Sequence, residues 1–420
     1  MGESAPANAS DSLKKGLRRI AGSPLAASLL CMFALSASVW GKGSTYIDDV
    51  SSTLMGIRQL VAGDAEHYVA IAHTLREGDL RMAHVEPTGG ADKGHRQPGF
   101  PALLALAGNL GVQGAPDLAR VNLGLVVASL WIAFLGVRLG TGSTLAALLA
   151  AAVIYDAPFL FQIATQRLLA EPLYVTIAVA AVSTCVSYLR KPGLVPLLLT
   201  AVFASAAYLV RVNGLFLAVS LGTTIVLADL MRARRQDPTA LPRDLTWHLP
   251  VGAYGVALLL LVVVAIPSWL PRTFYAGNPI YHGYLPNYLW VDTYDRAHVP
   301  GPPTYSLSTY VEEHDAGDAL ERLNYGVRRV FWDTPRDKLG TVSCVAVGTA
   351  LILIVALRDR VGLLLLWAGT LQALPLVWTA LPNPSRRIPA AALLPFAALL
   401  VATAAAALLR RVRSPGPDKA

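Results

Sequence analysis

This chain has few charged residues and few cysteines, and it lacks the motifs of common soluble enzymes. Only 15% of its 420 residues are charged, against about 25% in an ordinary soluble domain. The three cysteines, Cys31, Cys185 and Cys344, lie inside apolar runs, which argues against a disulfide framework or a zinc site. The histidines show no metal-ligand spacing, so the sequence indicates neither a divalent metal nor another cofactor. The glycine-rich stretch GTGST (140–144) lacks the lysine of a phosphate-binding loop.

Long apolar runs account for most of what is present. Hydrophobic residues make up 54% of the chain, and the mean hydropathy is +0.49. A membrane-spanning helix needs about 20 apolar residues, so the sequence predicts an all-α polytopic membrane protein of about ten transmembrane helices. The predicted spans are 21–40, 121–138, 143–162, 168–189, 193–210, 214–231, 248–269, 340–357, 361–380 and 388–409.

Basic residues at the ends of these runs predict the orientation of the chain. The N-terminal tail (1–20) and the C-terminal tail (411–420) are basic and are placed in the cytoplasm, on either side of a transmembrane domain spanning 21–410. The net charge of +8 is carried largely by such topology determinants. We therefore expect membrane lipids, and no nucleic acid, as partners of these basic residues.

An even number of spans leaves two long segments, 41–120 and 271–338, outside the cytoplasm. The short apolar stretch PGFPALLALAGNLGV (98–112) would make the number odd if it crossed the membrane. It begins with proline and is short, so we expect a juxtamembrane helix on the outer surface. The predicted location is the plasma membrane or inner membrane of a bacterium, since an alanine- and arginine-rich composition is typical of GC-rich genomes.

Several basic side chains break the positive-inside trend because they lie in outer turns. Charges at membrane depth are costly and often mark a site, although single arginines also extend to lipid headgroups. A set of cations at one interface suits a lipid phosphate, which arginine binds through several donors. The candidates for donor-phosphate binding are His95, Arg96, Arg167, Arg211, Arg386 and Arg387.

Acidic residues lie on the same outer side. Asp64 opens the helical stretch DAEHYVAIAHTLREGD, and the other candidates are Glu66, Asp48, Asp49 and Glu171. Two interpretations of Asp64 are open from its spacing: it caps the helix, or it accepts a proton from an acceptor hydroxyl as a general base.

Other polar and aromatic residues are open to two interpretations each. Asp156 near the outer end of its span is either a site residue or a polar helix contact. The aromatic segment 274–295, with Tyr281, Tyr288 and Trp290, either stacks on sugar rings or forms an interfacial belt.

Five motifs, in order along the chain, resemble the GT-C superfamily of glycosyltransferases. They are the acidic, tyrosine-bearing helix DAEHYVAIAHTLREGD, then HRQPGFPALLAL, the turns RLLAEPLYV and RVNGL, and the proline-rich SRRIPAAALLP before the last span. The closer likeness is to the branch of protein O-mannosyltransferases and lipid A aminoarabinose transferases. One departure is that the usual tandem acid pair reads Asp64-Ala65-Glu66, while Asp48-Asp49 forms a second pair nearer the first span.

The resemblance implies transfer of a sugar from a polyprenyl-phosphate donor to an acceptor hydroxyl at the outer face. It implies inversion, with Asp64 as the base, the basic residues on the leaving phosphate, Glu171 orienting an arginine or the sugar, and Tyr68 near the substrate. The rival interpretations are a non-enzymatic lipid-linked saccharide transporter or binding subunit, and a polysaccharide polymerase. The sugar stays open, mannose being a family-level expectation, as does whether the acceptor is protein, lipid or cell-envelope glycan.

Overall fold

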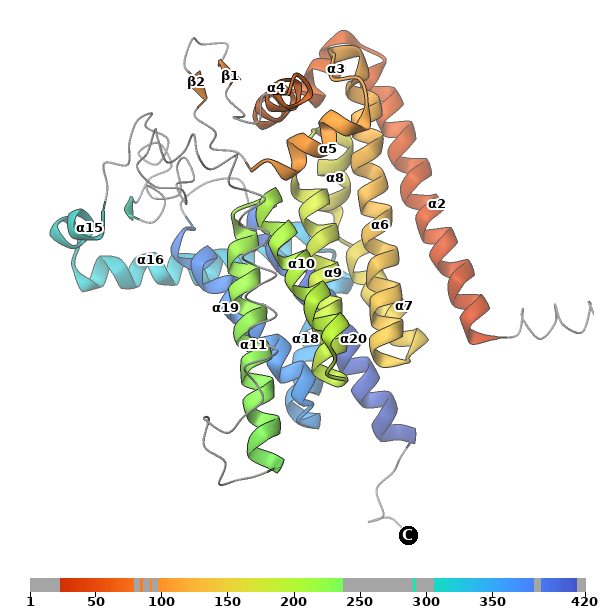
Figure 1. Cartoon of the computed structure of the whole chain (residues 1–420), viewed down its shortest axis with the longest axis vertical. Coiled ribbons are helices and arrows are strands. Elements are labelled where there is room, and N and C mark those ends of the chain that lie inside the picture. The colour runs from red at the N-terminus through yellow and green to blue at the C-terminus, as the bar shows by residue number, and fades with distance from the viewer. Residues whose placement is uncertain are drawn as a thin grey trace, which may run out of the picture.

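The described part of the chain forms a bundle of helices typical of a membrane protein. The computed structural model describes residues 23–78, 84–85, 91–92, 97–236, 290–291, 306–380 and 387–413. Within these ranges the regular elements are helices, apart from two antiparallel two-residue strands, β1 (His84–Val85) and β2 (Ala91–Asp92). Helices α4 and α5 lie at one end of the bundle and the C-terminal end of α20 at the other (Figure 1).

Nine of the ten predicted spans fall on described helices, and the tenth, 248–269, lies outside the described residues. Among the described residues, six helices are long and apolar enough to cross a membrane. They are α2 (Pro24–Ser51), α6 (Ala115–Thr141), α9 (Glu171–Arg190), α11 (Asn213–Gln236), α19 (Arg360–Trp378) and α20 (Arg387–Arg413). Two shorter apolar helices, α10 (Leu194–Val210) and α18 (Thr341–Leu357), complete the predicted set together with one bent pair.

The bent pair is α7 (Thr144–Tyr155) and α8 (Pro158–Gln166), which together occupy the predicted span 143–162 and meet at 53°. Pro158 lacks the N–H that would continue α7, and proline opens a new helix without strain. Asp156 lies at the break, where its carboxylate accepts from the Ser343 N–H (2.9 Å) and its carbonyl from the Gly340 N–H (2.8 Å). Asp156 therefore joins the break to the start of α18, and of its two interpretations the polar helix contact is the one observed.

Helices α9 and α20 form the centre of the bundle. In each, 78% of the most apolar window is buried, against 17% in α2 at the edge. Helix α9 packs against α6, α10 and α20, and α20 also packs against α7, α18 and α19. Both helices begin at the end that carries α4 and α5 (Figure 1). A side chain in their first turns is therefore held by the best-packed part of the protein.

Three short helices cover that end. They are α3 (Leu54–Leu60), α4 (Asp64–Arg76) and α5 (Gly99–Ala107), with a 3-10 turn η1 (Val112–Gly114) before α6. Helix α5 has nine residues, about 14 Å at 1.5 Å per residue, which is too short to cross a bilayer. The short length of α5 agrees with the prediction that 98–112 does not cross the membrane. Helix α5 packs on α4 and α10.

The second long segment that we predict outside the cytoplasm contributes α15 (Leu307–Glu313), α16 (Ala316–Arg328), a π-helical turn η3 (Arg329–Asp333) and α17 (Thr334–Lys338). The buried Arg322 guanidinium fixes α16 to the end of α19, because its Nε donates to the Trp378 carbonyl at 3.0 Å. The same guanidinium lies over the Trp378 and Tyr310 rings, 4.9 and 5.4 Å from their centroids. This cation–π contact holds α15 and α16 against the bundle.

Candidate functional site

Four charged side chains from four separate segments meet at the α4–α5 end of the bundle. Glu171 Oε1 lies 3.0 Å from Arg211 Nη1 and 3.1 Å from Arg387 Nε. Arg387 Nη2 in turn donates to Asp64 Oδ2. Asp64, Glu171 and Arg387 are the first residues of α4, α9 and α20, and Arg211 lies in the turn between α10 and α11. We call these four residues the charged cluster.

The charged cluster is partly withdrawn from water, and Glu171 entirely. The exposed fraction of the side chain is 0% for Glu171, 15% for Arg211, 22% for Arg387 and 30% for Asp64. A buried carboxylate without partners is strongly unfavourable. Glu171 has two arginines and the positive N-terminal end of α9 as compensation. The two acids and two arginines balance, so the cluster is neutral overall but strongly polar.

The arginines retain hydrogen-bonding capacity. An arginine carries five N–H donors in a planar fork. Among the described residues, neither Glu171 oxygen has a partner that meets hydrogen-bond geometry, so its contacts with the arginines are charge contacts. Arg387 uses Nη2 on Asp64 and points Nε at Glu171, which leaves Nη1. A phosphate oxygen is the acceptor that such a fork matches best.

Asp64 is not the helix cap that one interpretation of the sequence expected. The N-cap of α4 is Gly63, with a φ of 65°, and this residue has no side chain that could cap the helix. Asp64 is the first helical residue, and its carboxylate contacts Arg387. Glu66 lies in the same turn but is exposed and outside the charged cluster. The two acids of this motif therefore occupy different environments.

Close backbone contacts explain why two of the motifs contain glycine. A Cβ on Gly214 would lie 2.1 Å from the Tyr208 nitrogen and 2.2 Å from the Ala207 carbonyl carbon, so only glycine allows the tight turn that carries Arg211. A Cβ on Gly99 would lie 2.8 Å from the Leu209 carbonyl oxygen, where α5 meets the end of α10. Both motifs thus set the backbone position around Arg211.

A second layer of polar groups supports the cluster from within the bundle. Tyr174, one turn after Glu171 on α9, is buried, and its hydroxyl accepts from Gln372 Nε2 at 3.4 Å. The same Gln372 nitrogen also donates to the Asn213 carbonyl at 3.3 Å. This connects α9, α19 and the α10–α11 turn. We did not predict Gln372 from the sequence. A glutamine inside an apolar span is itself a signal, because polar residues within membrane spans are costly and often belong to a site.

The second acid pair lies elsewhere. Asp48 Oδ1 accepts from Arg120 Nη2 at 2.6 Å, and Arg120 Nη1 also donates to Asp117 at 2.6 Å. The side chain of Asp48 is 61% exposed, and Asp49 is exposed as well. This group joins the end of α2 to the start of α6. It is separate from the charged cluster, and among the described residues Arg120 is the arginine paired with Asp48.

Two other predicted site residues have contacts of a different kind. Tyr68 is buried on α4, and its ring meets Phe100 edge to face with centroids 5.1 Å apart, which packs α4 onto α5. Trp290 lies against Tyr310, with centroids 6.2 Å apart, in the aromatic group around Arg322. Arg167 ends α8 and is exposed. His95, Arg96, Tyr281, Tyr288 and Arg386 lie outside the described residues.

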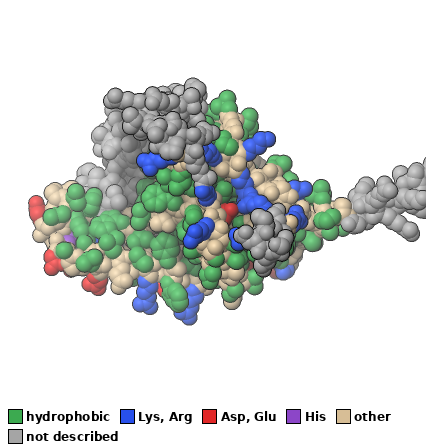
Figure 2. Space-filling model, turned by 90° about the horizontal axis from the view of Figure 1, so that it is seen from below, with side chains coloured by type: hydrophobic (Ala, Val, Ile, Leu, Met, Phe, Trp, Pro, Cys, Tyr) green, Lys and Arg blue, Asp and Glu red, His purple; other side chains and the backbone are tan. Residues whose placement is uncertain are grey.

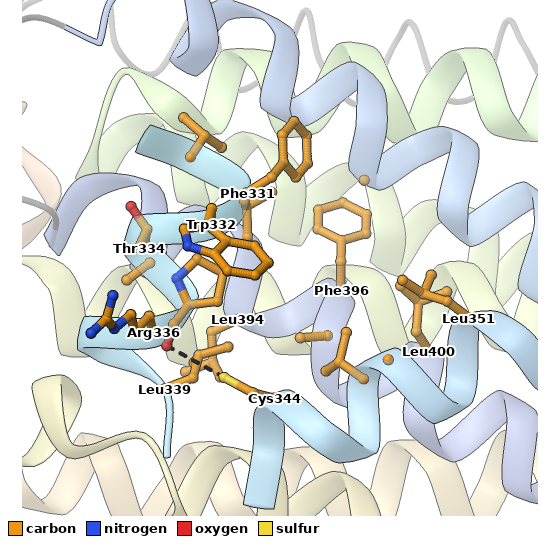
Figure 3. A pocket seen from close by; sticks show the side chains of 18 of the residues that line it. Phe331, Trp332, Thr334, Arg336, Leu339, Cys344, Leu351, Leu394, Phe396 and Leu400 are labelled. Atoms are coloured by element: carbon orange, nitrogen blue, oxygen red, sulfur yellow. Dashed lines mark hydrogen bonds between the residues drawn. The ribbon is translucent and has the colours of Figure 1, made fainter. Parts of the chain in front are cut away.

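An apolar cavity of about 620 Å³ lies beside the start of α20. Its walls come from η3, α17, α18, α19 and α20, and Phe331, Trp332 and Phe396 surround it with aromatic rings (Figure 3). Ala390 also lines it and follows Arg387 by three residues, a rise of about 4.5 Å along the helix. Arg336 contributes a charge to the wall. One lining residue of the cavity therefore lies within one turn of α20 from Arg387.

Within the described residues, no group of three or more His, Cys, Asp and Glu side chains is placed to hold a metal ion. The polar groups of the charged cluster are two carboxylates and two guanidinium groups. Such a set can bind an anion and can accept a proton.

Comparison with known proteins gives one structural similarity. Over 92% of this chain and 78% of the other, the structure resembles the crystal structure of ArnT from Cupriavidus metallidurans bound to undecaprenyl phosphate, with 13% sequence identity and a TM-score of 0.41. No family model matches the chain, and no curated protein matches it. At this degree of similarity we transfer no residue role from the neighbour.

Proposed function

We propose that this membrane protein transfers a sugar from a polyprenyl-phosphate donor to an acceptor hydroxyl at the outer face of the membrane. The observation that carries the proposal is the charged cluster of two arginines and two carboxylates, whose Arg387 lies three residues before Ala390, a lining residue of the apolar cavity. A donor with an anionic head and a long apolar tail matches this arrangement, because the head suits the charged cluster and the tail suits the apolar cavity. The order of the five sequence motifs supports the same reaction.

Arg211 and Arg387 are proposed to bind the donor phosphate. Each has a carboxylate partner that is held in place, yet each retains unused N–H donors. Glu171 is a positioning residue in this proposal, because its buried carboxylate fixes the distance between the two guanidinium groups. Two fixed positive charges in a site of low water content stabilise a departing phosphate more than they would in water. His95, Arg96, Arg167 and Arg386 remain predictions as further phosphate contacts.

Asp64 is proposed as the general base. Its carboxylate is paired with Arg387. A phosphate that binds Arg387 competes for that guanidinium and frees one Asp64 oxygen to face an acceptor hydroxyl. The base takes the hydroxyl proton while the acceptor oxygen attacks the anomeric carbon. The bond from that carbon to the phosphate oxygen breaks, and its electron pair leaves with the polyprenyl phosphate. One displacement of this kind inverts the configuration.

The cavity is proposed to hold part of the donor's apolar tail. Its lining is dominated by aromatic and aliphatic side chains, and it lies among the outer-half turns of α18 and α20 in the predicted orientation. Burial of apolar surface stabilises such binding by about 25 cal/mol per Å². The second outer segment, with α15 and α16, is proposed to cover the site and to help select the acceptor.

The test uses purified full-length protein, a radiolabelled polyprenyl-phosphate sugar and a membrane extract as the source of acceptor. We expect Asp64→Asn to lower transfer at least 100-fold, the lower range for a general base, while donor binding is kept. The matched control is Asp48→Asn, which removes an equivalent charge from the separate group with Arg120. Full transfer by Asp64→Asn, or an equal loss in Asp48→Asn, would refute the assignment of the base.

The same assay separates the rival functions. Wild-type protein that binds donors but transfers none of the sugars offered would be a binding subunit or a transporter. Products that grow as a chain on the acceptor would indicate a polysaccharide polymerase. The described span interiors carry few charged residues and the charged cluster lies at the helix ends, which favours chemistry at one face over a polar path through the bilayer.

A further inference from the structure

An arginine at the opposite end of the bundle has buried donor atoms without a hydrogen-bonding partner among the described residues. Arg190 is the last residue of α9 and is only partly exposed. Its Nε and Nη2 atoms are buried, and neither has a hydrogen-bond partner among the described residues. A desolvated guanidinium whose donors are unused is unfavourable. The described part of the chain therefore supplies no hydrogen-bond acceptor for these two nitrogen atoms.

A carboxylate close to Arg190, that of Asp359, already has other partners. Asp359 is 12% exposed, and its Oδ1 accepts from Arg410 Nη2 at 3.0 Å. Its other oxygen caps α19 by accepting from the Gly362 N–H at 2.9 Å. Arg190 lies within electrostatic range of both Arg410 and Asp359. Two guanidinium groups therefore share one carboxylate, which leaves an excess positive charge at this place.

This end of the bundle has the mixture of basic and apolar side chains expected where a protein meets lipid headgroups. Arg190 and Arg410 lie in the last turns of α9 and α20, the two most buried spans. Viewed from this end, Lys and Arg side chains stand among hydrophobic ones (Figure 2). In the predicted orientation this end meets the cytoplasmic leaflet, where anionic lipids are concentrated and where basic pockets between helices bind their headgroups.

We propose that Arg190 and Arg410 bind the phosphate of an anionic phospholipid from the cytoplasmic leaflet. The two guanidinium groups supply a net positive charge and free N–H donors, and the ends of α9 and α20 place them at headgroup depth. An anionic glycerophospholipid meets both requirements. A zwitterionic lipid brings an ammonium group that the arginines repel, and a free phosphate ion gains no contact with the apolar helix surfaces. The site is independent of the charged cluster and of the proposed reaction.

The experiment titrates the detergent-purified full chain with phosphatidylglycerol, with phosphatidylcholine and with inorganic phosphate. Retained lipid is counted by native mass spectrometry, and the thermal midpoint is measured in parallel. We expect phosphatidylglycerol to be retained and to raise the midpoint, with phosphatidylcholine and inorganic phosphate having at least tenfold weaker effects. Arg190→Gln and Arg410→Gln should each weaken phosphatidylglycerol binding at least tenfold.

The matched control is Arg413→Gln, which removes one charge from the same last turn of α20 at an exposed position. It should bind phosphatidylglycerol as wild type does. Equal binding by Arg190→Gln and wild type, an equal loss in Arg413→Gln, or an equal response to phosphatidylcholine or inorganic phosphate would overturn the proposal. Arg410 is 54% exposed, so Arg410→Gln keeps the test decisive if Arg190→Gln does not fold.

Discussion

Replacing Glu171 by glutamine tests the charged cluster directly. The substitution keeps the size of the side chain and removes its charge, so Arg211 loses the carboxylate 3.0 Å away and Arg387 the one 3.1 Å away. Breaking a buried ion pair costs about 3–5 kcal/mol because it leaves a desolvated charge without a partner. Arg387 keeps Asp64 and both arginines have some access to water. We therefore expect destabilisation near the lower limit, about 3 kcal/mol.

The free energy of unfolding is measured by titrating detergent micelles with a denaturing detergent while tryptophan fluorescence is recorded. The matched control is Glu66→Gln, the same change on an exposed glutamate outside the charged cluster, which should leave stability unchanged. Glu171→Asp keeps the charge and should recover part of the loss. In a double-mutant cycle, Glu171→Gln and Arg211→Gln should be strongly non-additive, with a coupling energy of about 1–3 kcal/mol.

One result would refute this reasoning. If Glu171→Gln unfolds at the same denaturant concentration as wild type and its effect adds to that of Arg211→Gln, then the carboxylate does not hold the arginines. Glu171 would also lose its proposed role in positioning the phosphate site.

Two further predictions concern the backbone and the cavity. Gly214→Ala should destabilise the protein by about 1–3 kcal/mol, because its Cβ would lie 2.1 Å from the Tyr208 nitrogen. Gly41→Ala is the control and should not destabilise the protein, since a Cβ there would have nothing within 4 Å. Equal thermal midpoints for the two variants would contradict the tight turn. Ala397→Phe places a ring in the cavity that Ala397 lines, and should raise the KM for a long-chain donor about tenfold with little change for a short-chain analogue. Val345→Phe, at an exposed position outside the cavity lining, is its control, and the same KM change in both variants would show that the cavity does not hold the tail.

The spans and their approximate bounds could be predicted because a transmembrane helix satisfies its backbone hydrogen bonds within itself. A run of about 20 apolar residues therefore carries nearly all the information that the helix needs. The bend between α7 and α8 had a local signal as well, since Pro158 lacks an N–H. The nine-residue α5 was foreseeable for the same reason, from the prolines at its start and its short apolar length.

The candidate site was only partly predictable. Asp64, Glu171, Arg211 and Arg387 were all candidates from the sequence, but so were Asp48, which pairs with Arg120 instead, and Arg167, which is exposed. The helix-cap interpretation of Asp64 was wrong because the local preference of aspartate for the N-cap was outweighed by its contact with Arg387, 323 residues away. Gln372 was missed because its partners, Tyr174 and Asn213, are distant in sequence.

The sequence by itself determined that this chain is a helical membrane protein and roughly where most of its helices begin and end. Hydrophobic length acts locally, so these properties can be inferred one segment at a time. The tertiary structure decided which of the candidate charges meet. Glu171 selects Arg211 and Arg387 because the packing of α9 against α10 and α20 brings three helix ends together, and a buried carboxylate requires partners of opposite charge wherever that packing places them.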